Sequence, residues 1–223
     1  MNKLLNKIIW PVMAAPAIYL ALVWNKIPVR VAMHFNLSGT PDRYGNKSEL
    51  QIMVAVLMAV NIGLYLLLSN AYRIDAKRPG KENKDRLERM AFAVSVFITC
   101  LTCYLIYNCI KGGGSPFSIR LVFGSIGLMW CIMGNYMYNI RPNYFAGFRT
   151  KWALNNEENW KKTHLLAGKL WFTGGLLLAI VCLFSSEKGA VIIFLFVTLV
   201  TTIIPGIYSY RLYKKQKVLN SVN

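Results

Sequence analysis

The chain has 223 residues, 55% of them hydrophobic, and its 26 lysines and arginines against nine acidic residues give a formal charge of +17. The charged residues are segregated from long apolar runs, an arrangement that excludes an ordinary soluble domain and is typical of a membrane protein. No RNA- or DNA-binding motif accompanies the basic charge. We therefore interpret it as a topological signal with some attraction to anionic lipid, and expect no direct nucleic-acid binding.

Six apolar runs are long enough to cross the hydrocarbon core of a bilayer, which needs about 20 helical residues. They are residues 8–24, 51–69, 90–110, 119–138, 165–184 and 189–208. We interpret the first run as a span and not as a signal peptide, because Pro11 and Pro16 interrupt it and no clear cleavage site precedes the polar loop. The sequence therefore predicts an all-α integral membrane protein with six transmembrane helices.

The lysines and arginines also predict an orientation. Nineteen lie in the N-terminus, the second and fourth loops and the C-terminal tail, whereas seven lie in the first, third and fifth loops. By the positive-inside rule, both termini and the fourth loop face the cytoplasm. We expect two units: residues 1–89 with two spans, an external loop and a basic cytoplasmic linker, and residues 90–223 with four spans and a cytoplasmic loop at 139–169.

The external loop between the first two spans, residues 25–50, is expected to be ordered. Hydrophobic residues alternate with others from Val29 to Phe35, which predicts an extended segment, and Ser38-Gly39 and Pro41-Asp42 then predict turns. This loop is either an outward recognition surface or a cap packed on the span ends.

A charged cytoplasmic linker joins the second and third spans, with Pro79-Gly80 at its centre. Opposite charges at helical spacing in its second half, such as Glu82 with Arg86, predict that the third span extends inward. On the external side, residues 111–116 are expected to form a flexible connector.

No metal site, cofactor site or catalytic site is predicted. His34 lies beside Asn36 and Asp42, but a zinc site usually needs three or four ligands. All five cysteines fall in or beside the spans, so neither disulfides nor zinc ligation is expected. All nine acidic residues and both histidines lie in loops or at span ends, whereas ion-coupled carriers usually need ionisable groups at membrane depth. Hydroxyl groups in the spans lack a neighbouring base, so we expect no enzyme.

Polar and small residues within the spans are expected to join helices. Asn61 and Thr99 suit hydrogen bonds between helices. Glycines that would let helices approach closely are Gly124, Gly127, Gly134, Gly174 and Gly175.

Residues 141–169 form the most distinctive polar segment. Pro142 ends the preceding helix, and an aromatic run broken by Gly147 follows. A short helix is then expected to begin near Asn156. Asn155 or Asn156 suits the N-cap, and Asn155 with Glu158 is a variant of a capping box.

On this helix Trp160 and His164 share one face, while Glu157 with Lys161 and Glu158 with Lys162 form charged pairs four residues apart. An amphipathic helix that carries tryptophan and lysine suits the lipid headgroup layer. It is either a recognition element or a re-entry helix that only anchors the next span.

These segments resemble a known family. Residues 143–152 (NYFAGFRTKW) and 156–164 (NEENWKKTH), followed by Gly168-Lys169, are similar to the signature of the SdpI family of bacterial membrane immunity proteins. Residues 34–45, with His34-Phe35-Asn36 at their start, resemble the short domain of unknown function that commonly precedes that signature. Lys151 and Ala32 stand where the family often has proline, which bears on loop geometry.

The resemblance implies a non-enzymatic protein of the bacterial cytoplasmic membrane that protects its cell from a secreted toxic peptide. It also implies that some members signal by capturing a soluble transcriptional repressor at the membrane. The implied toxin-facing residues outside are His34, Phe35, Asn36, Asp42 and Tyr44. The implied partner-binding residues inside are Asn143, Tyr144, Gly147, Arg149, Trp152, Glu157, Trp160 and His164.

Two alternatives stay open at this point. A small-molecule or peptide permease or exporter would use the cytoplasmic helix as a gate. A membrane enzyme acting on lipid or peptide would need a polar pocket containing Glu157, His164 and Arg149. The sequence does not give the oligomeric state.

Overall fold

The computed structural model describes residues 3–75, 83–111 and 118–222, with side chains for 5–75, 83–111 and 118–219. The expected linker centre at Pro79-Gly80, the carboxylate of Glu82 and the connector beyond Lys111 lie outside these residues. In chain order the elements are α1 (Lys3–Val23), a short 3-10 helix (Trp24–Lys26), β1 (Arg30–Phe35), β2 (Pro41–Asn46), α2 (Lys47–Ile74), α3 (Lys84–Ile110), α4 (Ile119–Met137), α5 (Lys151–Leu154), α6 (Glu157–Phe184) and α7 (Glu187–Val222).

Six helices in the described part of the chain are long and apolar enough to cross a membrane, which confirms the six predicted spans. Large apolar side chains lie exposed on their outer faces, for example Leu22 and Phe184 at 77% and 85% exposure. Hydrocarbon is the environment that such faces require. The chain is a multi-pass membrane protein.

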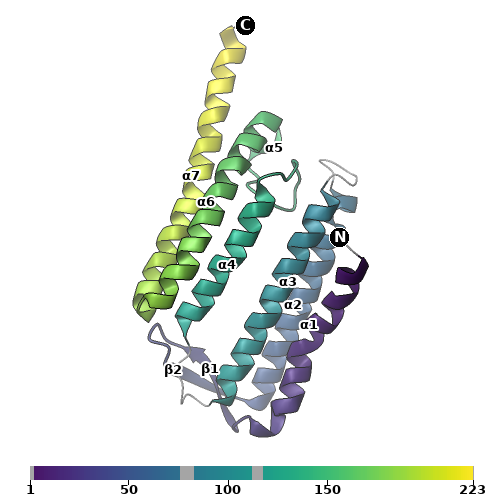
Figure 1. The fold of residues 1–223 in the computed structure, drawn as a ribbon, viewed down its shortest axis with the longest axis vertical. Coiled ribbons are helices and arrows are strands. Elements are labelled where there is room, and N and C mark those ends of the chain that lie inside the picture. Colours follow the sequence, from purple (N-terminus) through teal and green to yellow (C-terminus); the bar gives the residue numbers. More distant parts are fainter. Residues whose placement is uncertain (1–2, 76–82, 112–117, 223) are drawn as a thin grey trace.

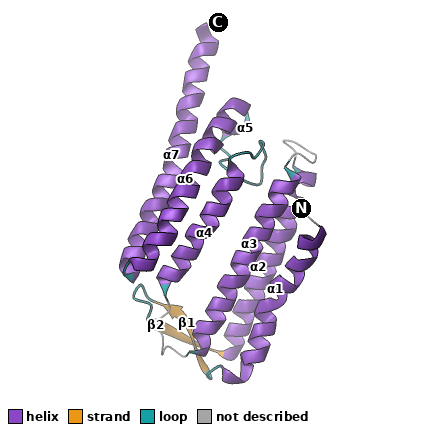
Figure 2. Cartoon of the chain, in the orientation of Figure 1, coloured by secondary structure: helices purple, strands orange, loops and turns teal. Residues whose placement is uncertain are grey.

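The six helices form two groups of three that lie side by side (Figures 1 and 2). α1 and α2 pack on α3, and α4 and α7 pack on α6. The hairpin of β1 and β2 lies at one end of the bundle, whereas α5, the start of α1 and the end of α7 lie toward the other (Figure 1). The two distinctive segments of the sequence are thus at opposite ends. The predicted unit boundary at residue 89 falls within α3.

Glycines set the distance between α4 and α6. A Cβ atom on Gly175 would lie 2.5 Å from the carbonyl oxygen of Gly127, and one on Gly134 would lie 2.7 Å from that of Gly168. Backbone meets backbone at both points, as in membrane helix pairs with small residues at the contact. The predicted close approach is therefore confirmed for these helices.

Hydrogen bonding and a shared core hold the remaining helices. The Nδ2 atom of Asn61 on α2 donates to the carbonyl oxygen of Ser95 and to Oγ1 of Thr99, each at 3.1 Å, as predicted for a polar link between spans. At the end where α5 lies, one apolar cluster joins the two groups of helices. Its buried members are Ala71, Tyr72, Leu87, Met90, Met133, Ile140, Ala146, Ala153 and Trp160.

Candidate functional site

The segment after α4 is folded around the side chain of Asn143, which is fully buried. Its Nδ2 donates to the carbonyl oxygens of Arg141 and Ala146, and its Oδ1 accepts from the amides of Phe145 and Ala146. One side chain thereby satisfies four backbone groups of a loop that has no regular secondary structure, as burial of a polar backbone requires. Asn143 acts as the organiser of this turn.

His164 on α6 holds the next part of the loop. The amide of Phe148 donates to Nε2 of His164 at 3.0 Å, so Nε2 carries no proton. The other ring nitrogen, Nδ1, lies 2.9 Å from the carbonyl oxygen of Trp160, which requires Nδ1 to donate. The geometry thus selects a neutral imidazole with both nitrogens engaged. His164 therefore offers no free nitrogen for acid–base chemistry.

Gly147 is the residue that lets the loop approach the imidazole. Its φ is +104°, a left-handed conformation that side chains other than glycine rarely adopt. A Cβ atom at this position would lie 2.2 Å from Nε2 of His164. Both conditions restrict this position to glycine.

Trp160 stands at the centre of the apolar cluster that joins the helix groups. Its ring stacks on His164 with centroids 3.9 Å apart, and its Nε1 donates to the carbonyl oxygen of Ile140 at 2.7 Å. Trp160 and His164 are each only 1% exposed. This face of the helix therefore packs against the loop and the neighbouring helices and is not exposed to lipid.

The expected short amphipathic helix is the first part of a longer one. α6 runs unbroken from Glu157 to Phe184, so the expected cytoplasmic helix and the fifth span are one element. Its N-cap is Asn156, whose Oδ1 accepts from the amide of Asn159, and the capping box expected from Asn155 does not form. Asn155 instead ends the four-residue helix α5, which was not predicted.

Two polar residues outside the segment fasten it to the first helix group, and sequence reasoning missed both. Asn83, just before α3, exchanges two hydrogen bonds with the backbone of Arg141. Asp75, at the end of α2, accepts from the amide of Tyr144. Because their partners are backbone groups 58 and 69 residues away, no local pattern could reveal them.

A second missed network fastens the segment to α7. The Oδ1 atom of Asn159 accepts from the hydroxyls of Thr163 and Ser209, and its Nδ2 donates to the carbonyl oxygen of Ser209. Ser209 also lies 3.3 Å from the hydroxyl of Thr150, which caps α5. The sequence signal for this network was the four-residue spacing of Asn159 and Thr163 on α6. Thr163 lies between Trp160 and His164, the two residues that were singled out as candidates.

The solvent-facing candidates are Tyr144, Arg149 and Glu157, which are exposed. Arg149 donates to the carbonyl oxygen of Tyr144 at 2.6 Å. Half-buried Trp152 stacks on Tyr213 of α7, with centroids 6.0 Å apart. The structure therefore divides the candidate set into these four accessible residues and a second group, Asn143, Gly147, Trp160 and His164, that shapes the loop.

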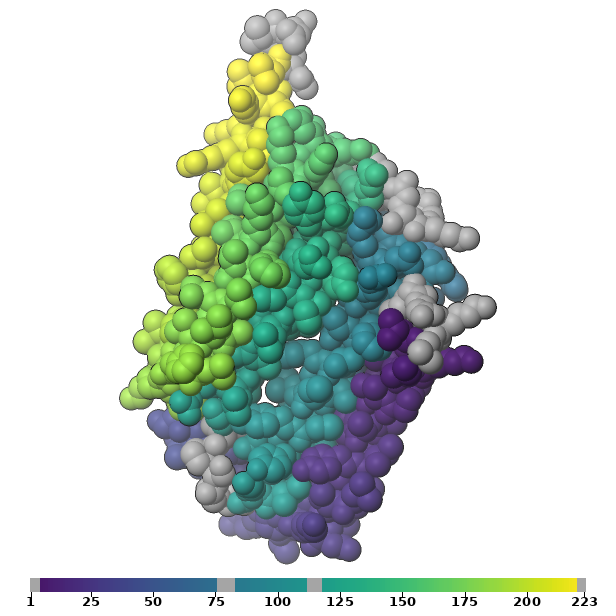
Figure 3. All heavy atoms as spheres, in the orientation of Figure 1, coloured from purple at the N-terminus to yellow at the C-terminus, as the bar shows by residue number. Residues whose placement is uncertain are grey.

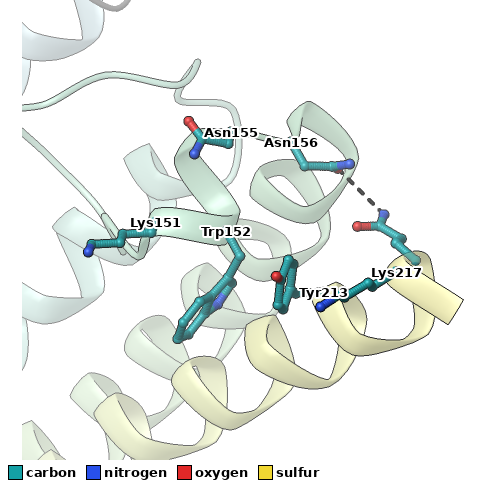
Figure 4. A pocket seen from close by; sticks show the side chains of 7 residues that line it. Lys151, Trp152, Asn155, Asn156, Tyr213 and Lys217 are labelled. Carbon is teal, nitrogen blue, oxygen red and sulfur yellow. Dashed lines mark hydrogen bonds between the residues drawn. The ribbon is translucent and has the colours of Figure 1, made fainter. Parts of the chain in front are cut away.

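Trp152 and Tyr213 form the floor of a groove of about 710 Å³ between α5 and the end of α7 (Figure 4). Lys151 and Lys217 lie on its two sides, and Gln216 donates across it to Asn156. Lys151 is the first residue of α5, where proline is also favoured in helices. The first position of α5 would therefore accept either lysine or the proline that often stands there in the family, without a change of the helix.

At the other end of the molecule, β1 and β2 pair as an antiparallel hairpin. The extended segment predicted around residues 29–35 is confirmed as β1, whereas the predicted turn at Pro41-Asp42 is wrong, because these residues begin β2. The turn lies earlier, where Oδ1 of Asn36 accepts from the amides of Ser38 and Thr40. A hairpin is thus a small addition to the predicted all-α fold.

The hairpin presents most of its candidate residues to the outside of the bundle. His34, Asn36, Asp42 and Tyr44 are exposed, and Phe35 is half-buried. Nδ1 of His34 lies 2.5 Å from Oδ1 of Asp42, across the two strands. The described residues include no group of three or more metal-ligating side chains.

The opposite face of the hairpin is packed on the helices. Val31 and Ala32 are buried, and the carbonyl oxygen of Ala32 lies 3.5 Å from Sγ of Cys109 on α3. Val31 belongs to an apolar cluster with Leu50 and Ile106, at the ends of α2 and α3. The hairpin is both a cap on the span ends and an exposed surface, so the two readings of the loop are compatible.

Comparisons with known proteins match two separate regions of the chain. Residues 139–209 match the model of the SdpI/YfhL protein family, and residues 12–59 match a domain of unknown function, DUF1648. The chain is also 31% identical over 103 residues to the immunity protein SdpI of Bacillus subtilis (strain 168). Residues 139–209 are therefore similar to the SdpI/YfhL family.

The aligned region covers 46% of this chain, which spans about half (49%) of the length of the Bacillus subtilis relative. No solved structure matches the chain significantly. The SdpI/YfhL match begins two residues before Arg141 and ends at Ser209, so it contains the loop, α5, α6 and the polar link to α7. The DUF1648 match contains most of α1, the hairpin and the first part of α2.

Proposed function

We propose that this protein is a membrane immunity protein that protects its cell from a secreted toxic peptide. The observation that carries the proposal is the 31% identity over 103 residues to an immunity protein of Bacillus subtilis. The match of residues 139–209 to the SdpI/YfhL family supports it, because this region contains the loop that Asn143 and His164 organise.

The hairpin is proposed to face the toxin. Its exposed edge carries a histidine–aspartate pair and an aromatic ring, with Arg30 lying 5.8 Å from the centroid of Tyr44. Such a mixture of charge, hydrogen-bonding groups and aromatic surface suits a short peptide. The positive-inside count supports an external position for the hairpin, since the opposite end has most of the basic residues.

The cytoplasmic segment is proposed to report the toxin by holding a soluble repressor at the membrane. Tyr144, Arg149, Trp152 and Glu157 are its accessible residues and would make the contacts. The buried residues would act by shaping the loop.

Growth of a sensitive bacterial strain tests the proposal. The strain would express the chain or an empty vector and receive a purified secreted toxic peptide of bacterial origin. We expect the chain to raise the tolerated peptide concentration at least about tenfold, and Tyr44→Ala with His34→Ala to lower it again, because the exposed ring and the hydrogen bond between His34 and Asp42 are lost.

Lys188→Ala is the matched control, since Lys188 is exposed at the predicted external end but lies outside the hairpin. Immunity is refuted if cells with normal amounts of the protein are as sensitive as those with the vector.

A fluorescently tagged repressor tests the second part of the proposal, the holding of a repressor at the membrane, independently of resistance. Its recruitment to the membrane should depend on Arg149 and Glu157, and resistance should not.

A further inference from the structure

A crevice separates the two groups of helices near the end where α5 lies. Its volume is about 520 Å³, and its lining residues are Leu5, Arg89, Phe92, Ala93, Val96, Ile132 and Tyr136. The α3 members recur at three- and four-residue spacing and so share one helix face. α4 forms one wall, and α3 with the start of α1 forms the other, on the face of the molecule seen in Figure 3.

The crevice has two chemically different ends. Arg89 and Tyr136 lie where α3 begins and α4 ends, at the limits of the predicted spans. Phe92, Ala93 and Val96 lie deeper, since seven residues of helix cover about 10 Å. A polar mouth at the level of the headgroups therefore leads into an apolar wall at the depth of hydrocarbon.

Within the described residues, the polar mouth keeps hydrogen-bonding groups that the protein does not use. Neither the Arg89 guanidinium nor the Tyr136 hydroxyl makes a hydrogen bond to any side chain or backbone group in the ranges that the structure covers. Asp85, one turn before Arg89, interacts with it electrostatically. Arginine at this level still has donors for a phosphate, which it binds with two parallel hydrogen bonds.

We propose that this crevice binds one anionic phospholipid, with an acyl chain against Phe92, Ala93 and Val96 and the phosphate at Arg89 and Tyr136. The charge of Arg89 selects the sign of the headgroup, and the predicted cytoplasmic position of this end places it beside the anionic leaflet. The acyl chain of the lipid fills the apolar part of the crevice. It thereby joins two helix groups that otherwise share their core mainly at the loop.

Native mass spectrometry of the full chain in mild detergent, with added phosphatidylglycerol, measures this binding. Arg89→Gln should weaken phosphatidylglycerol binding about fivefold, the contribution of one cationic side chain near an anionic surface. Arg89→Lys should retain most of the affinity. Arg211→Gln is the matched control, because Arg211 is exposed on α7 outside the crevice and removes the same charge.

A second pair of variants tests the apolar wall. Val96→Trp should fill the crevice and reduce binding, whereas Val60→Trp, on an exposed face of α2, should leave it unchanged. If Val96→Trp does not fold, the Arg89 variants still decide. The proposal is overturned if Arg89→Gln and Arg211→Gln behave alike, if phosphatidylcholine binds as tightly, or if a second copy of the chain occupies the crevice.

Discussion

Gly147 and His164 show how a single backbone position fixes the shape of the loop after α4. The left-handed φ of Gly147 brings the amide of Phe148 onto the imidazole, and the imidazole is held in turn by the carbonyl oxygen of Trp160. Each of these contacts depends on the next. A substitution that breaks one of these contacts should therefore alter the loop even if the buried apolar area stays the same.

Replacing Gly147 by alanine should destabilise the protein by about 1–3 kcal/mol, because a left-handed residue becomes strained and its new methyl group meets the imidazole. Denaturant unfolding in detergent, followed by tryptophan fluorescence, measures the change. Gly63→Ala is the control: no atom outside its own helix lies within 4 Å of the added Cβ, and alanine favours the helix by up to about 1 kcal/mol. Equal stability of the two variants would contradict this account of the loop.

The sequence identified which residues of α6 are distinctive, but it did not predict what surrounds their side chains. The four-residue spacing correctly placed Trp160 and His164 on one face. It could not distinguish a lipid interface from a protein core, because the groups that cover this face come from Ile140 and Phe148. The spacing of residues along a helix shows which side chains share a face. Contacts from other segments determine whether that face meets lipid or protein.

At the scale of elements, α4 and α6 form the tightest pair in the molecule. Their contact depends on the absence of side chains at Gly127, Gly134, Gly168 and Gly175, where each helix touches the backbone of the other. Apolar area contributes little to association of helices in a bilayer, so close packing has to hold the pair.

Gly175→Ala should therefore push the two helices apart and cost about 1–3 kcal/mol, the usual effect of overpacking. Its Cβ would lie 2.5 Å from the carbonyl oxygen of Gly127, a backbone atom that cannot rotate away. Thermal unfolding in detergent should show a lower midpoint for this variant. Gly206→Ala, which adds the same methyl group to open space on α7, should leave the midpoint unchanged or raise it.

Hydropathy predicted all six long helices, since a run of about 20 apolar residues has few alternatives. The hairpin was only half predicted. Pro41-Asp42 has the composition of a turn, yet Asn36 supplies the turn and Pro41 begins the edge strand β2, a position that proline tolerates. The four-residue helix α5 was missed because one turn of helix has no periodicity to detect.

At the scale of the whole molecule, the hairpin and the loop after α4, which belong to different matched regions, lie at opposite ends of one bundle (Figure 1). The excess of basic residues belongs to the end with α5 and the termini, which predicts that this end is cytoplasmic.

Cysteine labelling measures that orientation. In a variant with the five native cysteines replaced by alanine, Asn36→Cys should react with a membrane-impermeant maleimide in intact cells, because Asn36 is exposed on the hairpin. Glu157→Cys, exposed at the start of α6, should react only after the membrane is opened. The reverse pattern would invert the proposed roles of the two surfaces.

Helix α2 connects these two surfaces directly. It begins at Lys47, immediately after β2, and at its other end Asp75 accepts a hydrogen bond from the amide of Tyr144. Its 28 residues form a rod of about 42 Å with no proline to bend it. A load on the hairpin along this axis is transmitted through one straight helix to the loop after α4, so the two ends of the bundle are mechanically connected.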